Sequence, residues 1–219
     1  HTRRRRQRQM CIRDRLMQSE VEALNQVLAT PAKPLLAIIG GAKVSSKLSI
    51  LENLLGRVDK LIVGGGMAYT FVKAQGGRIG NSLVEDDMMD KAREILDKAN
   101  AEGTEFLLPE DTLCADKFAP DAQTHVHPSH DIPNGWMGLD IGPVARERFV
   151  KAVMESRTIL WNGPMGVFEM DVFAKGTKDV AAALATATTK HDAFTLIGGG
   201  DSVAVSYTHL TLPTTSCVL

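Results

Sequence analysis

The sequence lacks several features that would place it in common classes of protein. It contains no run of roughly 20 apolar residues, the length that a membrane-spanning helix needs, so no membrane span is expected. Its three cysteines show neither CxxC nor other metal-binding spacing, which favours a reducing, cytoplasmic compartment. The arginine-rich start leads into no apolar segment and is therefore not a secretory signal.

Two common nucleotide-binding fingerprints are also missing. The pattern G-x-x-x-x-G-K-[S/T] does not occur, which excludes a P-loop enzyme. The pattern G-x-G-x-x-G is incomplete, because Tyr69 stands where Gly64 and Gly66 would require a third glycine. A dinucleotide-dependent oxidoreductase is therefore disfavoured, although it is kept as one alternative.

The distribution of charge sets the two ends of the chain apart. Seven arginines and one acid lie in the first fifteen residues, although the net charge of the chain is −1. Residues 1–14 and 206–219 differ in composition from the rest, and we expect foreign or disordered tails there. This leaves residues 15–205 as the folded domain. The alternative is a stand-alone nucleotide-binding module with a basic, RNA-binding arm.

Short apolar runs alternate with helical patterns between the two tails, which predicts an α/β fold. The fold class is a doubly wound, Rossmann-like, mostly parallel sheet with helices on both faces. Expected strands cover residues 35–40, 61–64, 106–108, 158–163 and 195–198, and expected helices cover 45–55, 67–75, 84–101, 143–155 and 172–189.

Glycines follow four of the five expected strands. They occur in segments 40–43, 64–67, 162–166 and 198–201. Ligands of open α/β sheets bind beyond the carboxyl ends of the strands, where a glycine lets backbone N–H groups come close to an anion. The four turns together predict an extended ligand that carries phosphate.

Five motifs in order resemble the phosphoglycerate kinase family. They are Gly40-Gly-Ala-Lys-Val-Ser-Ser-Lys47, Gly64-Gly-Gly-Met-Ala-Tyr-Thr-Phe71, Trp136-Met-Gly-Leu-Asp-Ile-Gly-Pro143, Leu160-Trp-Asn-Gly-Pro-Met-Gly-Val-Phe-Glu169 and Gly198-Gly-Gly-Asp-Ser202. The resemblance implies the C-terminal, nucleotide-binding domain of a bacterial-type member, truncated at both ends.

The resemblance also implies a reaction and its partners. The family transfers a phosphoryl group between 1,3-bisphosphoglycerate and ADP, giving 3-phosphoglycerate and ATP, with Mg²⁺ accompanying the nucleotide. The phosphoglycerate would bind to an N-terminal domain that is missing here, so turnover by this chain alone is not expected. No nucleic acid or membrane partner is implied, and the intact protein is expected to be a cytoplasmic monomer.

Particular residues take their roles from the same resemblance. Lys43 is expected to follow the transferring phosphoryl group as the catalytic residue, and Lys47 to contact the nucleotide phosphates. The two lysines stand four apart, so on a helix they would share one face. Asp201 is expected to bind Mg²⁺, and its alternative role is to cap a following helix.

The remaining site residues belong to the nucleotide as well. Glu169 is expected at the ribose hydroxyls. The other expected contacts are Gly41, Gly199, Gly200 and Ser202 near the phosphates and Gly66, Gly138 and Asn162 around the adenosine. Three nearby histidines, His125, His127 and His130, are assigned no metal, because an irregular loop is expected there.

Overall fold

A parallel sheet forms the centre of the protein in the computed structural model, which describes residues 31–199 and 216–218. Every strand pair in it is parallel, in the order β11-β10-β9-β1-β2-β4, which confirms the predicted fold class. The strands are β1 (Leu35–Ile39), β2 (Lys60–Val63), β4 (Glu105–Leu107), β9 (Thr158–Asn162), β10 (Phe194–Gly198) and β11 (Ser216–Val218).

The tails expected at the two ends lie mostly outside the described residues. Residues 1–14 and 206–215 are not among those that the structure describes. Ser216–Val218, within the second expected tail, pairs with β10 as strand β11. The domain boundaries therefore stay a prediction.

The central strand shows why both faces of the sheet are covered. All five residues of β1 are buried, and they alternate between two apolar cores. Leu36 and Ile38 pack with the first core, whereas Leu35, Ala37 and Ile39 pack with the second. A strand that is buried on both faces needs continuous apolarity, which is the pattern that predicted it.

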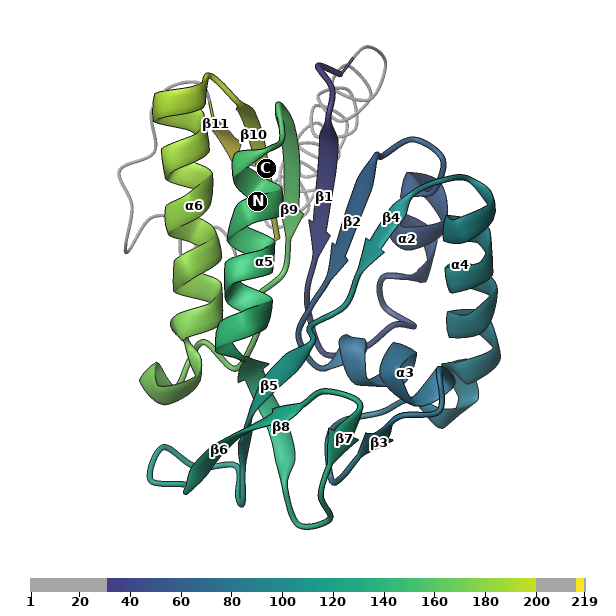
Figure 1. The fold of residues 1–219 in the computed structure, drawn as a ribbon, viewed down its shortest axis with the longest axis vertical. Coiled ribbons are helices and arrows are strands. Elements are labelled where there is room, and N and C mark those ends of the chain that lie inside the picture. The colour runs from purple at the N-terminus through teal and green to yellow at the C-terminus, as the bar shows by residue number, and fades with distance from the viewer. Residues whose placement is uncertain (1–30, 200–215, 219) are drawn as a thin grey trace, which may run out of the picture.

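Helices cover the two faces in separate groups (Figure 1). Helices α5 (Pro143–Met154) and α6 (Lys175–His191) share the first core with the sheet. The second core contains residues of α2 (Leu48–Leu54), α3 (Met67–Ala74) and α4 (Met89–Ala101). Two short 3₁₀ turns, η1 (Asp86–Met88) and η2 (Asp171–Phe173), precede α4 and α6. All five expected helices are present.

The first helix begins later than the sequence predicted. Helix α2 starts at Leu48, so Lys47 is its N-cap and Lys43 lies in the preceding turn. The prediction that both lysines share a helix face is therefore wrong. The hydroxyl of Ser46 donates to Lys43 O, and Ser45 bonds to Glu85, and such side-chain bonds compete with helical ones.

A second, antiparallel sheet was not predicted. Its strands, in the order β6-β5-β8, are β5 (Asp111–Ala115), β6 (Thr124–Pro128) and β8 (Met137–Ile141). Two short strands, β3 (Arg78–Ile79) and β7 (Asp131–Ile132), pair beside it. Figure 1 shows these strands beyond the carboxyl ends of the main sheet.

The small sheet corrects the expectation of an irregular loop around the histidines. His125 and His127 lie on β6, and both rings contact the Trp136 ring, with centroids 5.0 and 5.7 Å away. Within the described part of the chain, no helix has the length and apolarity needed to cross a membrane.

Candidate functional site

Four glycine turns lie together at the carboxyl edge of the main sheet. Because β10, β9, β1 and β2 are parallel neighbours, their carboxyl ends meet at one edge. Gly40 N donates to Asn162 O at 2.9 Å, which joins the turns after β1 and β9. Gly65 N donates to Met165 O at 3.1 Å, which joins the turn after β2 to the same segment. The expected common edge is confirmed.

These turns approach one another too closely for side chains. A β-carbon at Gly40 would overlap the carbonyl oxygen of Pro164. At Gly65, where φ is +70°, it would lie 2.6 Å from Gly41 O. Glycine is therefore required at both positions, and the absence of side chains leaves the backbone open to a ligand.

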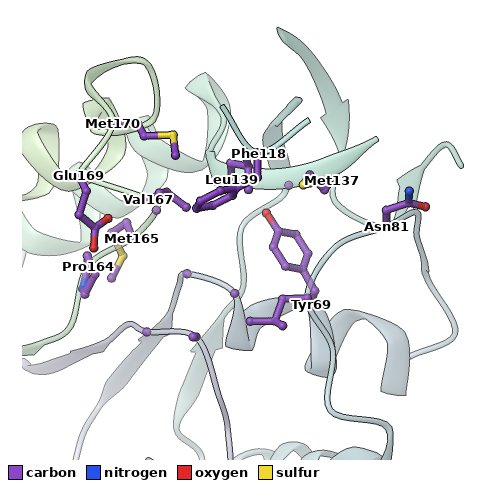
Figure 2. A pocket seen from close by; sticks show the side chains of 17 residues that line it. Tyr69, Asn81, Phe118, Met137, Leu139, Pro164, Met165, Val167, Glu169 and Met170 are labelled. Atoms are coloured by element: carbon purple, nitrogen blue, oxygen red, sulfur yellow. The ribbon is translucent and has the colours of Figure 1, made fainter. Parts of the chain in front are cut away.

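A cavity of about 750 Å³ opens between this edge and the small sheet (Figure 2). Its volume lies within the range of small-molecule sites. The lining residues are Gly41, Ala42, Gly65, Gly66, Tyr69, Asn81, Leu83, Phe118, Met137, Gly138, Leu139, Pro164, Met165, Gly166, Val167, Glu169 and Met170.

One part of the cavity is apolar. Figure 2 shows Phe118, Leu139 and Val167 close together, with the Tyr69 hydroxyl directed toward the strand that carries Met137. The Phe118 side chain is 59% exposed although it is large and apolar. An exposed aromatic ring at the wall of a cavity is typical of a binding surface for a flat, apolar ligand group.

Gly138 makes room for Tyr69 in this wall. A β-carbon at Gly138 would overlap the Tyr69 hydroxyl. That hydroxyl is buried, donates to Thr112 Oγ1 at 3.5 Å, and has its pKa raised by burial. Gly138 is among the residues that line the cavity, and its expected contact with adenosine stays a prediction.

Most of the apolar wall was missed by the sequence analysis. Leu83 lies between β3 and η1, and Phe118 lies between β5 and β6, both outside every glycine motif in the sequence. Met137 and Leu139 flank Gly138 on β8, so they lie on the same face of the strand. This spacing of two is the one signal that could have identified them.

The polar end of the site holds a lysine and an amide. Lys47 Nζ donates to Asn162 Oδ1 at 2.6 Å, across 115 residues of sequence. A β-carbon at Gly199 would lie 3.2 Å from the same oxygen. Asn162 is not among the residues that line the cavity, but it accepts this bond from Lys47 beside it, and its expected role at the nucleotide stays a prediction.

A carboxylate braces the turn that carries Lys43. Glu85 accepts from Ser45 N at 3.0 Å and from Ser45 Oγ at 2.5 Å. Burial raises the pKa of Glu85. The hydrogen bonds from Ser45 and Val44 and the charge of Lys43 lower it by more, so the pKa of Glu85 lies below its ordinary value. Lys43 itself is exposed.

The predicted site residues divide into four groups. Gly41, Gly66, Gly138 and Glu169 line the cavity, and Lys47, Asn162 and Gly199 lie together next to it. Lys43 is on the adjacent turn. Gly200, Asp201 and Ser202 lie outside the described residues.

The comparisons with known proteins agree on one family. The family model described as phosphoglycerate kinase matches residues 7–212. The phosphoglycerate kinase of Deinococcus radiodurans is 54% identical over 189 residues, which are 86% of this chain and 45% of that protein. A protein of Nicotiana tabacum named "Phosphoglycerate kinase, cytosolic" is 53% identical over 189 residues, or 86% and 47% of the two chains.

Solved structures show the same similarity. Phosphoglycerate kinase from Coxiella burnetii superposes with a TM-score of 0.85 at 41% identity, over 93% of this chain and 51% of the other. The Pyrococcus horikoshii OT3 enzyme gives 0.74 at 29%, over 93% and 50%. The chain spans about half the length of the relatives that it matches.

Proposed function

Because the chain belongs to the phosphoglycerate kinase family, we propose that its described residues form the nucleotide-binding half of such an enzyme. The observation that carries this proposal is the cavity itself, which has an apolar wall at one side and glycine turns with Lys47 nearby. An adenosine group suits the first feature and a chain of phosphates suits the second. The occupant is ADP or ATP.

Each part of the nucleotide has a matching part of the site. The adenine ring packs against Phe118 and Leu139, and Glu169 accepts hydrogen bonds from the ribose hydroxyls. The phosphates bind to backbone N–H groups of the turns after β1 and β10 and to Lys47. Lys43, on an exposed turn, follows the phosphoryl group during transfer, so that catalysis is positioning and charge neutralisation.

Magnesium enters with the nucleotide. Among the described residues, no three His, Cys, Asp or Glu side chains are grouped so that they could hold a metal. Mg²⁺ needs only one or two carboxylates when phosphate oxygens and water complete its shell, so a nucleotide-borne ion fits this edge. Asp201, outside the described residues, is the proposed protein ligand, and Gly200 and Ser202 would bind the neighbouring phosphate.

The whole protein would catalyse reversible phosphoryl transfer between 1,3-bisphosphoglycerate and ADP. We place the acidic substrate on the half of the protein that this chain does not include, and hinge closure would join the halves. The chain alone should therefore bind nucleotide without turnover. We place the intact protein in the cytoplasm, where a relative is named cytosolic, and expect it to be a monomer.

Calorimetric titration tests the proposal with two matched lysine variants. The unmodified chain should bind Mg-ADP and not NAD. Lys47→Ala should weaken Mg-ADP binding by about tenfold or more, because a charge-assisted contact to phosphate is lost. Lys60→Ala, which removes ion pairs to Glu155 and Glu105 at the start of β2, should leave the affinity unchanged.

Two outcomes would contradict this assignment. Equal losses in Lys47→Ala and Lys60→Ala would show that charge in general, and not the carboxyl edge, binds the nucleotide. Binding of NAD in preference to Mg-ADP would favour the dinucleotide alternative. Phosphoglycerate-dependent ATP consumption by this chain in a coupled assay would disprove the predicted lack of turnover.

A further inference from the structure

One wall of the cavity is a turn clamped between two elements. Segment 163–170 lies between β8 and the first turn of α6. Val167 N donates to Leu139 O on β8 at 2.8 Å. On the other side, Met165 N donates to the buried Thr177 Oγ1 on α6 at 3.0 Å. The position of this wall therefore depends on how firmly β8 and α6 are held together.

Asp140 joins β8 to α6 directly. Its Oδ2 accepts from Gly176 N, in the first turn of α6, at 2.7 Å, and its Oδ1 accepts from Ile141 N at 2.9 Å. The residue is 2% exposed. A β-carbon at Gly166 or Gly176 would overlap the carboxylate, so the wall and the helix both pack tightly against it.

The surroundings of Asp140 have opposing effects on its pKa. Burial raises the pKa of Asp140 to about 7, although the N–H groups of Gly176 and Ile141 and the positive charge of Arg146 favour the ionised form. Asp179 on α6 opposes ionisation, and Arg146 on α5 pairs with it at 3.3 Å. The buried hydroxyl of Tyr69 on α3 also interacts electrostatically with Asp140.

We propose that Asp140 is a positioning residue of the nucleotide cavity, whose carboxylate holds the wall 163–170 between β8 and α6. The inference rests on the proposed function, because it concerns the same cavity. Protonation replaces a charge-assisted bond at the positive end of α6 with a weaker one, and the wall loosens. Binding of the adenosine group should therefore strengthen as the pH rises through the pKa of Asp140.

Asp111 provides a matched control. It is also a buried aspartate of the small sheet, and its two oxygens accept from Val144 N at 3.1 Å and Ala145 N at 2.7 Å. It therefore caps α5 as Asp140 caps α6. Among the described residues neither helix lines the cavity, but the wall 163–170 bonds to α6 through Met165 N and Thr177 Oγ1, whereas Asp111 bonds to α5.

The test is a titration with adenosine, which carries no group that ionises near neutral pH, unlike the phosphates of ADP. Between about pH 5.5 and 8.5, which brackets the pKa of Asp140, the affinity of the unmodified chain should rise about fivefold. Asp140→Asn should bind with a constant affinity close to the weaker limit, and Asp111→Asn should keep the rise. A flat profile in the unmodified chain overturns the proposal, as does a rise that survives in Asp140→Asn.

Two further measurements separate the possible failures. If Asp111→Asn loses the rise as completely as Asp140→Asn, both carboxylates act only through overall stability, and the positioning role is wrong. Mg-ADP is titrated in parallel: if neither ligand binds, the proposed function fails, whereas Mg-ADP binding beside a flat adenosine profile contradicts Asp140 alone.

Hydrogen exchange keeps the proposal testable if Asp140→Asn does not fold. In the unmodified chain, the protection of the Gly176 amide relative to the Ala145 amide should increase over the same pH range. A ratio that stays constant would show that the bond to Asp140 does not respond to protonation, and would overturn the proposal.

Discussion

Different interactions hold the amino edge and the carboxyl edge of the parallel sheet. At the amino edge, charged side chains bind one another and the backbone. Lys60 bonds to Glu155 at 2.8 Å, and Asp59 accepts from Lys33 Nζ and Leu35 N at 2.9 and 2.8 Å. At the carboxyl edge, glycine turns pack backbone against backbone and leave a cavity. One edge is held by pairs of charged side chains, and the other by close backbone contacts beside an open cavity.

This difference shows where the fold tolerates change. An exposed ion pair contributes little to stability, because water screens it and two flexible side chains must be ordered. A close backbone contact that leaves no room for a β-carbon cannot accommodate a substitution without a shift of the backbone. Substitutions in the glycine turns of the carboxyl edge should therefore affect both stability and binding, whereas those at the amino edge should leave binding intact.

Gly40→Ala should have the largest effect. The new β-carbon would overlap the carbonyl oxygens of Pro164 and Gly163, which cannot move without breaking the edge. We expect a loss of about 3 kcal/mol or more in the free energy of unfolding, and loss of Mg-ADP binding. Urea unfolding measures the first and calorimetry the second.

A glycine from the amino edge is the control for Gly40. Gly103, before β4, has φ +71° and open space around its missing side chain. Gly103→Ala should cost about 1–2 kcal/mol through backbone strain alone and leave nucleotide binding intact. Equal losses in the two variants would mean that the two edges do not differ in the way described.

Phe118→Ala should have an intermediate effect and should separate binding from stability. The ring is mostly exposed, so its loss should change the free energy of unfolding by no more than about 0.5 kcal/mol. Adenosine affinity should fall about tenfold, because the ring supplies apolar area to the cavity wall. Val126→Ala, 48% exposed on β6 and away from the cavity, should change neither. A normal affinity in Phe118→Ala would place the adenine elsewhere.

The sequence predicted the parallel sheet well and the small sheet not at all. Strands such as β1 are continuously apolar and alternate with helical patterns, so a short stretch of sequence is enough to identify them. Strand β6 is exposed along most of its length and contains a proline, so it has no apolar face to detect. Its position depends on pairing with β5, which local sequence does not encode.

The position of the glycine turns was predicted, whereas their role in binding a ligand stays a prediction. Glycine turns mark the carboxyl edge, because Gly40 approaches Pro164 and Gly65 approaches Gly41 too closely for a side chain. The Lys47–Asn162 bond spans 115 residues, and the Asp140–Gly176 bond spans 36. Such bonds follow from the packing of helices on the sheet, and no spacing rule predicts them.

Glu85→Gln should have the smallest effect and tests how rigidly the carboxyl edge is held. An amide can accept one of the two Ser45 hydrogen bonds but not both, so the turn that carries Lys43 becomes less fixed. Mg-ADP affinity should fall about threefold at neutral pH, as calorimetry would measure. Glu155→Gln, which removes the ion pair to Lys60 at the amino edge, should leave the affinity unchanged.

The stability of both glutamate variants should also depend on pH differently from that of the unmodified chain. The pKa values of Glu85 and Glu155 both lie below the ordinary 4.5 in the folded protein. Each ionised form therefore stabilises the fold above about pH 4.5, and the contribution disappears as the pH falls through the lowered value. Thermal unfolding of either variant should thus be less sensitive to acid than that of the unmodified chain. If the Glu155 variant also weakened nucleotide binding, the stability of the whole sheet, and not the bracing of one turn, would control the site.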